Sequence, residues 1–274
     1  MFTDSFFRQG VSHTVCEDYA SRGEDFAVVS DGCSSGDDTD WGSRVVCKLT
    51  ERNLHLLRGP DRSVGEFLRA LTSDMKSLND IWLHLSSDSM LATLGLLYTD
   101  GPVVRCLLVG DGVIGARRKD GVWEYATHEQ PRGGCFYPYY LAEDGWAETY
   151  RSQFGGGLEI NDFVGFEGEE KPRTSDDRCQ RDYQEAEWTT DGHDFWFVGS
   201  DGWMSFTERV NTGTSKYTQK VATGSALSVF LGDEECRRRL GMENYQRLAF
   251  KEYAAKNWQN HDDVSMAVID RGSP

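Results

Sequence analysis

The sequence predicts an α+β protein whose strands are mainly antiparallel. Two Asp-Gly pairs, Asp100-Gly101 and Asp120-Gly121, each separate two short apolar runs within residues 91–126. An Asp-Gly pair between apolar runs is a strong signal for a β-hairpin. Long segments with helical periodicity lie before and after this block of strands, and a last apolar strand is expected at 264–269.

A buried strand followed directly by a helix is predicted near the start of the chain. Residues 26–30 begin with the apolar run Phe-Ala-Val-Val, and its β-branched and aromatic content is typical of a buried strand. From Trp41 onward, apolar residues recur at helical spacing. Thr39 or Asp40 is the expected cap of this helix.

A second, longer helix is predicted to begin after Ser63. Ser63 and Glu66 have the spacing of a capping box. The apolar stripe that follows is expected to pack against a sheet or the first helix, and it consists of Phe67, Leu71, Met75, Leu78, Trp82 and Leu85.

The second half of the chain is less regular. Residues 91–126 are expected to form one antiparallel meander, interrupted by Gly110-Asp111-Gly112. From 127 to 192 glycine, aromatic and charged residues dominate, so we expect an irregular flap or insertion within a single domain, 1–274. Regular structure is predicted to resume with a strand at 195–199, helices at 215–231 and 236–258, and the strand at 264–269.

Charge and composition limit the classes of partner. The 274 residues carry a formal net charge of −16, and the pI is near 4.8. This balance argues against nucleic acid or an anionic membrane surface as the main partner. No apolar run approaches membrane-spanning length. With 38% hydrophobic residues the chain can bury a large core, as an ordinary globular protein does.

The cysteines and the N-terminal residues predict a cytoplasmic protein. The seven cysteines form no Cys-x-x-Cys pair, which disfavours a zinc knuckle or a dithiol redox site. Their odd number fits a reducing compartment better than a disulfide framework. The N-terminal residues have no basic start followed by an apolar core, so no signal peptide is predicted.

Acidic residues stand repeatedly at the ends of predicted strands. Asp31-Gly32 and Asp201-Gly202 follow apolar strands, Asp262 precedes one, and Glu17-Asp18 and Asp111 are further candidates. Carboxylates that converge at sheet ends repel one another unless they are protonated or neutralised by metal. Hard oxygen ligands with few histidines favour Mg²⁺ or Mn²⁺ over zinc. For each acidic turn taken alone, a merely solvated surface is the alternative interpretation.

Six short motifs occur in an order that resembles the metal-dependent type 2C serine/threonine protein phosphatases, in a divergent, bacterial-type branch. They are ED, VVSDG, LATLGLLY, VGDG, VGSDGW and DDVSMAVI, and the similarity runs from 12 to 269 with 127–192 largely unmatched. The resemblance implies an α-β-β-α sandwich, with two packed, mainly antiparallel β-sheets flanked by helices. It also implies a signalling hydrolase of phosphomonoesters in Ser/Thr-phosphorylated proteins, with attack by a hydroxide that bridges two Mg²⁺ or Mn²⁺ ions.

The resemblance gives roles to individual residues around the two ions. Asp31 would bridge both metals, and Gly32 would offer its backbone carbonyl to one of them. Glu17 would join that second metal, and Asp18 would hold its waters.

Three further aspartates complete the implied site. Asp201 and Asp262 would complete the ligand set of the first metal. The expected catalytic residues are therefore Asp31, Asp201 and Asp262. Asp111 matches the acidic residue associated with a third, weaker metal. Trp41 and Trp203 flank the acidic loops and are expected to anchor them by packing.

The chain also departs from the family pattern. The arginine that usually clamps phosphate is His13 here, which makes His13 the candidate phosphate contact, and Arg8 and Arg44 are alternative substitutes. The histidine that often follows the Asp-Gly pair is Cys33. The remaining departures are Ser34-Ser35 for Gly-Gly, Asp111-Gly112 for Asp-Ser, and Asp262-Asp263 for Asp-Asn. These changes bear on phosphate affinity and leaving-group protonation more than on metal binding.

Three rival interpretations follow from the same sequence. Cys16 and Arg22 have the spacing of a cysteine phosphatase loop, but the carboxylates between them would repel phosphate. A phosphatase-like binding module that retains metal with little or no turnover would explain His13 and Cys33. A calcium-stabilised β-sandwich adhesin is disfavoured by the cysteine usage.

Overall fold

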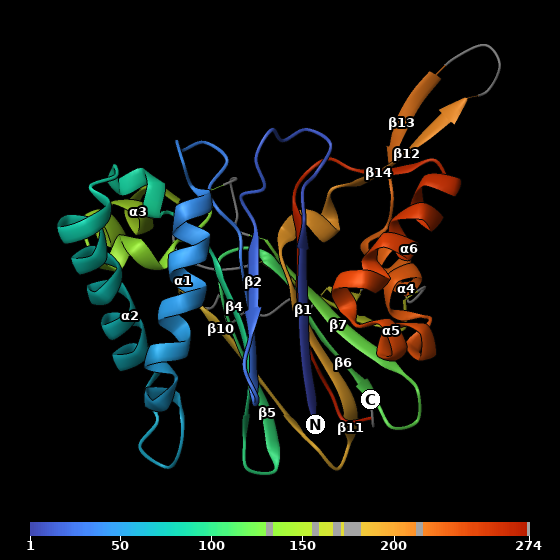
Figure 1. Cartoon of the computed structure of the whole chain (residues 1–274), viewed down its shortest axis with the longest axis horizontal. Coiled ribbons are helices and arrows are strands. Elements are labelled where there is room, and N and C mark those ends of the chain that lie inside the picture. Colours follow the sequence, from blue (N-terminus) through green and yellow to red (C-terminus); the bar gives the residue numbers. More distant parts are fainter. Residues whose placement is uncertain (130–133, 155–158, 167–170, 173–181, 212–215, 273–274) are drawn as a thin grey trace.

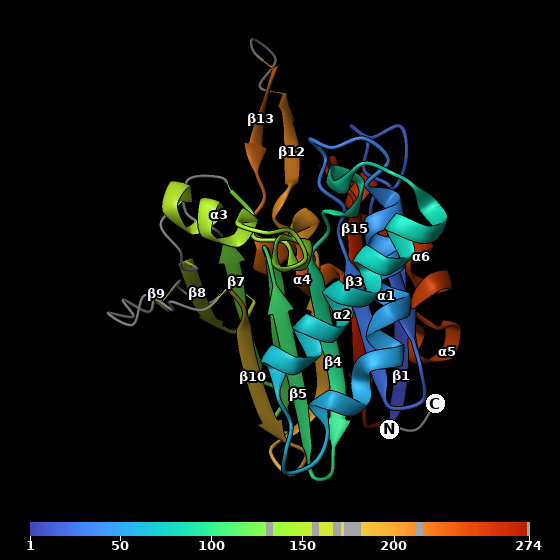
Figure 2. The ribbon, with the colours of Figure 1, turned by 90° about the vertical axis from the view of Figure 1, so that its left-hand side faces the viewer.

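Two β-sheets lie face to face, and helices cover both outer faces (Figure 1). The structure is a computed structural model that describes residues 1–129, 134–154, 159–166, 171–172, 182–211 and 216–272. One sheet has the strand order β1-β15-β11-β6-β7-β8-β9, and the other has the order β10-β5-β4-β3-β2. Helices α1 and α2 cover the five-stranded sheet, and α4 and α6 lie on the opposite side of the sandwich (Figures 1 and 2). The predicted α-β-β-α sandwich is confirmed.

The elements have the following bounds. The strands are β1 (Phe2–Arg8), β2 (Tyr19–Arg22), β3 (Phe26–Ser30), β4 (Leu94–Asp100), β5 (Val103–Val109), β6 (Gly112–Arg118), β7 (Trp123–Glu129), β8 (Glu159–Val164), β9 (Lys171–Pro172), β10 (Gln184–Thr189), β11 (His193–Gly199), β12 (Phe206–Asn211), β13 (Lys216–Lys220), β14 (Trp258–Asn260) and β15 (Val264–Asp270). The α-helices are α1 (Asp40–Asn53), α2 (Val64–Leu78), α3 (Trp146–Phe154), α4 (Thr223–Leu231), α5 (Glu234–Leu240) and α6 (Met242–Ala255). Short 3₁₀ or π turns are η1 (Leu54–Leu57), η2 (Asn79–Leu83), η3 (Ser87–Met90), η5 (Pro138–Leu141) and η6 (Asp201–Met204).

The apolar core has three layers. Leu71 and its neighbours on α1 and α2 pack against the five-stranded sheet. Phe230 and the other apolar residues of α4 and α6 pack against the seven-stranded sheet. Between the two sheets lies a third layer that includes the fully buried Trp196 and Val198. Central strands therefore bury both faces, which explains the continuous apolar runs in their sequences.

Antiparallel pairing brings the acidic strand ends together. Because β4 is antiparallel to both β3 and β5, the C-terminal ends of β3 and β5 lie at the same end of their sheet. In the other sheet β11 pairs with β15, so the end of β11 lies beside the start of β15. The connection from β1 to β2 and the start of α1 lie at this end of the sandwich (Figure 1). Residues far apart in the sequence thereby meet in one place.

The chain changes sheets at Gly110-Asp111-Gly112, so the predicted single meander of 91–126 is wrong. The β4–β5 hairpin belongs to the five-stranded sheet and the β6–β7 hairpin to the seven-stranded sheet. Asp-Gly turns specify which strands pair locally, but they carry no information about the sheet that each pair joins. Gly110 has a φ of +101°, and a Cβ there would lie 2.7 Å from the Thr93 side chain. The crossing between sheets thus needs glycine.

The segment 127–192 contains more regular structure than the sequence predicted. Helix α3 and strands β8, β9 and β10 fall within it. Strand β10 forms an edge of the five-stranded sheet beside β5, and β8 pairs with β7 in the other sheet. An edge strand needs only a half-buried face, so the sequence of β10, QEAEWT, has no apolar run. Residues 130–133, 155–158, 167–170 and 173–181 lie outside the described residues, and a flap role for the segment stays a prediction.

The second predicted helix begins as expected but ends earlier. The Ser63 hydroxyl accepts a hydrogen bond from the Glu66 amide at 3.2 Å, as the capping box predicted. Helix α2 ends at Leu78, and the π turn η2 follows. This turn changes the helical phase, so Trp82 leaves the buried stripe and is 75% exposed.

Three other predictions are wrong, one about the first helix and two about the C-terminal part of the chain. Residues 216–220, predicted to be helical, form the exposed strand β13, which pairs with β12, and helix α4 begins later. Trp203 is fully buried as expected, whereas Trp41 is 45% exposed and anchors nothing by burial. The predicted helix at 236–258 is two helices, α5 and α6, that meet at Gly241 with a φ of +72°.

The packing of α2 leads to a stability prediction. Leu71→Ala removes a fully buried side chain and is expected to lower the free energy of unfolding by about 2–5 kcal/mol. Trp82→Ala, in the exposed π turn, should change it by no more than about 0.5 kcal/mol. Urea denaturation of both variants measures the difference. Equal losses in the two variants would contradict the described end of the α2 stripe.

Candidate metal centre

Asp31 and Gly32 are held at the end of β3 by backbone contacts on both sides. The Asp31 amide donates to the Thr93 hydroxyl at 3.0 Å, and the Thr93 amide donates to the Asp31 carbonyl at 2.8 Å. The Gly32 amide donates to the Glu17 carbonyl at 3.2 Å. A Cβ on Gly32 would lie 2.6 Å from the Thr39 carbonyl oxygen, so only glycine fits here. The strand end is therefore fixed beside the Glu17-Asp18 pair.

The carboxyl groups of Asp18, Asp31 and Asp201 lie together at this end of the sandwich, where Asp18 is buried and the other two are half-buried. Burial raises the pKa of Asp31 well above its usual value, and the neighbouring carboxylates of Asp18, Asp201 and Asp262 raise it further. Burial is also the main cause of the raised pKa of Asp18 and of Asp201. Asp262 and Asp111 both add to the repulsion at Asp201. Like charges this close in a buried site need protons or cations.

Two oxygens of this group lack partners within the protein. Among the described residues, Asp18 Oδ1 and Asp201 Oδ1 are buried without a hydrogen-bond partner. A buried carboxylate oxygen without a partner is costly, and a divalent cation would satisfy it. The donor set consists of hard oxygens, so these residues fit Mg²⁺ or Mn²⁺.

Asp18 is oriented by a serine that the sequence did not single out. The Ser200 hydroxyl donates to Asp18 Oδ2 at 2.7 Å and accepts from the Ser265 amide at 3.0 Å. Ser200 therefore links the ends of β11 and β15 to the acidic pair before β2. Its place directly before Asp201 was the only available signal in the sequence.

Asp263 was also missed, although it ties the N-terminal loop to the site. Its carboxylate accepts hydrogen bonds from the amides of Gly10 at 2.7 Å and Glu17 at 2.5 Å. Its side chain is fully buried. Asparagine, which the family pattern has here, offers one side-chain acceptor atom, whereas both oxygens of Asp263 accept. Asp263 thus positions the backbone of Glu17, whose carboxylate in turn accepts from the Thr39 hydroxyl at 3.3 Å.

His13 lies among carboxylates. Its Nδ1 is 3.4 Å from Glu17 Oε2 and 3.3 Å from Asp263 Oδ2, and its Nε2 is 3.3 Å from Asp262 Oδ1. Burial by itself would lower the pKa of His13, but Asp263, Asp262 and Glu17 outweigh burial and raise it. Ligand atoms of His13, Glu17 and Asp263 all lie within 4.8 Å of one another, so this trio could also hold a cation.

The other candidate phosphate contacts are engaged elsewhere. Arg8 donates to Gln246 at 3.2 Å and lies over the Phe250 ring, on the helical face of the seven-stranded sheet. Arg44 interacts with Asp40 at 3.4 Å and lies over the Tyr19 ring. Neither arginine makes a described contact with the acidic group.

The surroundings of Cys16 disfavour its thiolate form. Burial raises the pKa of Cys16, and the adjacent carboxylates of Asp263 and Asp18 raise it further. A thiol held protonated is a poor nucleophile, so the cysteine phosphatase alternative fails. Cys33, which stands where the family often has histidine, has its sulfur 3.1 Å from the Ser35 hydroxyl.

The side chains predicted as metal ligands lie at one end of the sandwich, and their binding of metal stays a prediction. Asp31 interacts with Asp18, Asp201 and Asp262, Asp111 adds to the repulsion at Asp201, and Glu17 is linked to Asp262 through His13. In addition, no helix in the described part of the chain is long and apolar enough to cross a membrane.

Residues 10–161, more than half of the chain, match the family model described as protein phosphatase 2C. The chain belongs to the protein phosphatase 2C family. It is a metal-dependent serine/threonine protein phosphatase. No curated protein sequence matches it.

Solved phosphatases share this fold at low sequence identity. The Mycobacterium tuberculosis serine/threonine phosphatase PstP/Ppp is 14% identical, with a TM-score of 0.53 over 99% of each chain. A bacterial serine phosphatase is 10% identical, with a TM-score of 0.53 over 100% of this chain and 99% of that chain. Stp1 from Staphylococcus aureus is 12% identical, with a TM-score of 0.51 over 99% of this chain and 95% of that chain. These likenesses show the fold of the family.

Buried carboxylates predict a particular pH dependence for the metal-free phosphatase. The folded-state pKa of Asp18 and of Asp201 is raised from 3.8 to about 7. As pH rises, the unfolded chain therefore releases these protons before the folded chain does. The stability that the two protonated carboxyl groups contribute is complete below about pH 4 and is lost by about pH 7. The melting temperature in chelator should fall between pH 5 and pH 8, and Mn²⁺ should restore it.

Asp201→Asn supplies the control for this titration. Asparagine cannot ionise, so the fall in melting temperature between the same two pH values should be smaller in this variant. An unchanged fall would mean that other groups dominate the titration.

Proposed function

We propose that the phosphatase cleaves phosphoserine and phosphothreonine esters in proteins by direct attack of water, without a phosphoenzyme. Two divalent cations, when bound, would lower the pKa of the attacking water and neutralise charge on the phosphate. The observation that carries this proposal is the group of Asp18, Asp31 and Asp201, in which Oδ1 of Asp18 and Oδ1 of Asp201 are buried and have no partner among the described residues.

The position of each residue indicates which ion it would bind. Asp31 lies between the other carboxylates and would contact both ions, and Gly32 would supply its carbonyl. Glu17 and Asp18 would hold the second ion directly or through water. The backbone around them is fixed by Thr93 and Asp263, so little reorganisation is needed on binding.

The remaining ligands lie on the seven-stranded sheet. Asp201 and Asp262 would complete the ligand set of the first ion, and Asp111 would bind a third, more weakly held ion. Asp201 begins the turn η6 directly after β11, and Asp262 precedes β15. Because these two strands pair side by side, the two ligands keep their spacing.

The phosphate would enter beside His13. A cavity of about 420 Å³ adjoins the acidic group and is lined by residues of the 12–17 and 34–40 segments, including His13 and Glu17. Its size suits a phosphorylated side chain. A protonated His13 would pair with a phosphate oxygen once cations neutralise Glu17 and Asp262.

Asp31→Asn is expected to lower Mn²⁺-dependent hydrolysis of p-nitrophenyl phosphate by at least about a hundredfold, because it removes a ligand shared by both ions. Asp120→Asn, at an exposed aspartate of the β6–β7 turn that lines neither cavity, is the matched control and should retain wild-type activity. Initial rates over a range of Mn²⁺ concentrations make the comparison. Wild-type turnover in Asp31→Asn would refute the assignment.

His13→Gln tests the phosphate contact. If His13 pairs with the substrate phosphate, KM for p-nitrophenyl phosphate should rise about tenfold, with a much smaller change in the Mn²⁺ concentration needed for half-maximal rate. The opposite result, weaker Mn²⁺ activation at unchanged KM, would assign His13 to the ion-binding group instead.

The binding-module alternative has its own signature. The position of His13 among three carboxylates is the observation in its favour. Purified protein that binds two Mn²⁺ ions by calorimetry but hydrolyses neither phosphopeptide nor p-nitrophenyl phosphate would support it.

A further inference from the structure

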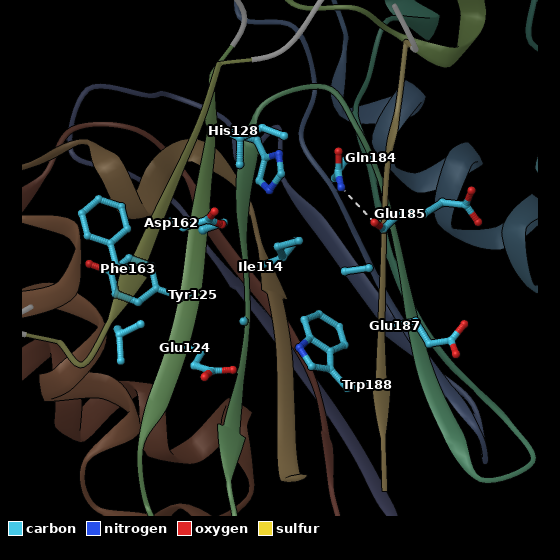
Figure 3. A pocket seen from close by; sticks show the side chains of 15 residues that line it. Ile114, Glu124, Tyr125, His128, Asp162, Phe163, Gln184, Glu185, Glu187 and Trp188 are labelled. Atoms are coloured by element: carbon cyan, nitrogen blue, oxygen red, sulfur yellow. Dashed lines mark hydrogen bonds between the residues drawn. The ribbon is translucent and has the colours of Figure 1, made fainter. Parts of the chain in front are cut away.

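A second cavity of about 470 Å³ lies between the two sheets, where β7 and β8 face the edge strand β10 (Figure 3). None of the predicted metal ligands lines it. Its volume lies within the range of ligand pockets. Small residues create the space, since Ala126 and Ala186 stand where larger side chains would fill the layer between the sheets.

His128 projects into this cavity from β7 (Figure 3). It is only 1% exposed, and neither ring nitrogen has a hydrogen-bond partner among the described residues. Burial lowers the pKa of His128 to about 4, so the ring is neutral near pH 7. A neutral imidazole has one donor and one acceptor, and leaving both unused in the interior is costly. An occupant with polar hydrogens would satisfy the acceptor nitrogen.

The charged side chains that the structure describes inside the cavity are acidic. Among the described lining residues there is no lysine or arginine, and Asp162 lies on the same side of the sheet as His128 (Figure 3). Glu185 and Glu187 point away from the cavity and pair with Arg62 and Arg105. This described part of the inner surface disfavours phosphate and other anions.

One wall of the cavity is aromatic and apolar. Trp188 projects inward from β10, and Ile114 projects from β6 (Figure 3). An indole face attracts cations and also packs against flat apolar groups. Polar and apolar groups are thus arranged at opposite parts of one cavity.

We propose that this cavity is a binding site for a small organic cation, a protonated amine with a flat apolar body. The ammonium group would donate hydrogen bonds to the Asp162 carboxylate and to the acceptor nitrogen of His128. The body would lie against Trp188 and Ile114. The site is independent of the metal centre and of phosphate hydrolysis.

Three probes of equal size separate charge from shape. Tyramine is the cation, 4-hydroxyphenethyl alcohol is its neutral counterpart and 4-hydroxyphenylacetate is the anion. Titration calorimetry on the full chain with saturating Mg²⁺ keeps the acidic metal centre from taking up the amine. Tyramine should bind saturably and at least about tenfold more tightly than either other probe, as expected for one charged hydrogen bond. Equal binding of the three probes, or no saturable binding of tyramine, would overturn the proposal.

Variants locate the site. Asp162→Asn should weaken tyramine binding about tenfold or more, and Ala186→Leu should abolish it by filling the space. Asp120→Asn removes the same charge from the β6–β7 turn outside the cavity and should bind like wild type. Circular dichroism checks that each variant is folded. If Ala186→Leu does not fold, the affinity of Asp162→Asn for tyramine alone decides the test. Wild-type affinity in Asp162→Asn would place the amine elsewhere and refute the assignment.

Discussion

Mutual repulsion among buried carboxylates is the constraint around which this phosphatase is arranged. Asp18, Asp31 and Asp201 lie together at one end of the sandwich, where burial and neighbouring charge both favour their protonated forms. No single strand could hold them together, since each comes from a different part of the chain. The two sheets provide the rigidity, because apolar layers on both faces of the central strands fix the strand ends. Such a group is stable only when protons or cations neutralise it.

The carboxylates also depend on a scaffold of neutral and charged hydrogen bonds. Ser200 joins Asp18 to the start of β15, and Asp263 joins the backbone of Gly10 and Glu17 to the same place. The fit is tight, since a Cβ on Gly202 would lie 1.7 Å from the Asp263 carbonyl oxygen. The N-terminal loop is therefore seated on the last strand of the chain. This contact brings the acidic pair before β2 close to aspartates that are more than 180 residues away in the sequence.

Two acidic spaces in one molecule differ in the cations they suit. The metal centre offers almost only carboxylate oxygens, which favours small hard ions. The space between the sheets offers one neutral imidazole, an indole face and a carboxylate on β8, which favours a larger organic cation. The net charge of −16 favours the binding of cations in general, but it does not determine which kind of cation binds at each place. The side chains that line each site determine this.

Much of this protein could be predicted from its sequence. Asp-Gly turns predicted the hairpins, and the capping box predicted the start of α2, because each is a local pattern with a local physical cause. The order of the short acidic motifs indicated the family. The sequence could not show that β5 and β6 join different sheets, that β10 completes an edge, or that Trp82 turns outward. Nor could it reveal Asp263, Ser200 or the isolated His128, since their roles come from contacts with distant residues. Local propensities determine the elements, but only the packing of two sheets decides which side chains meet, because burial and charge act through space rather than along the chain.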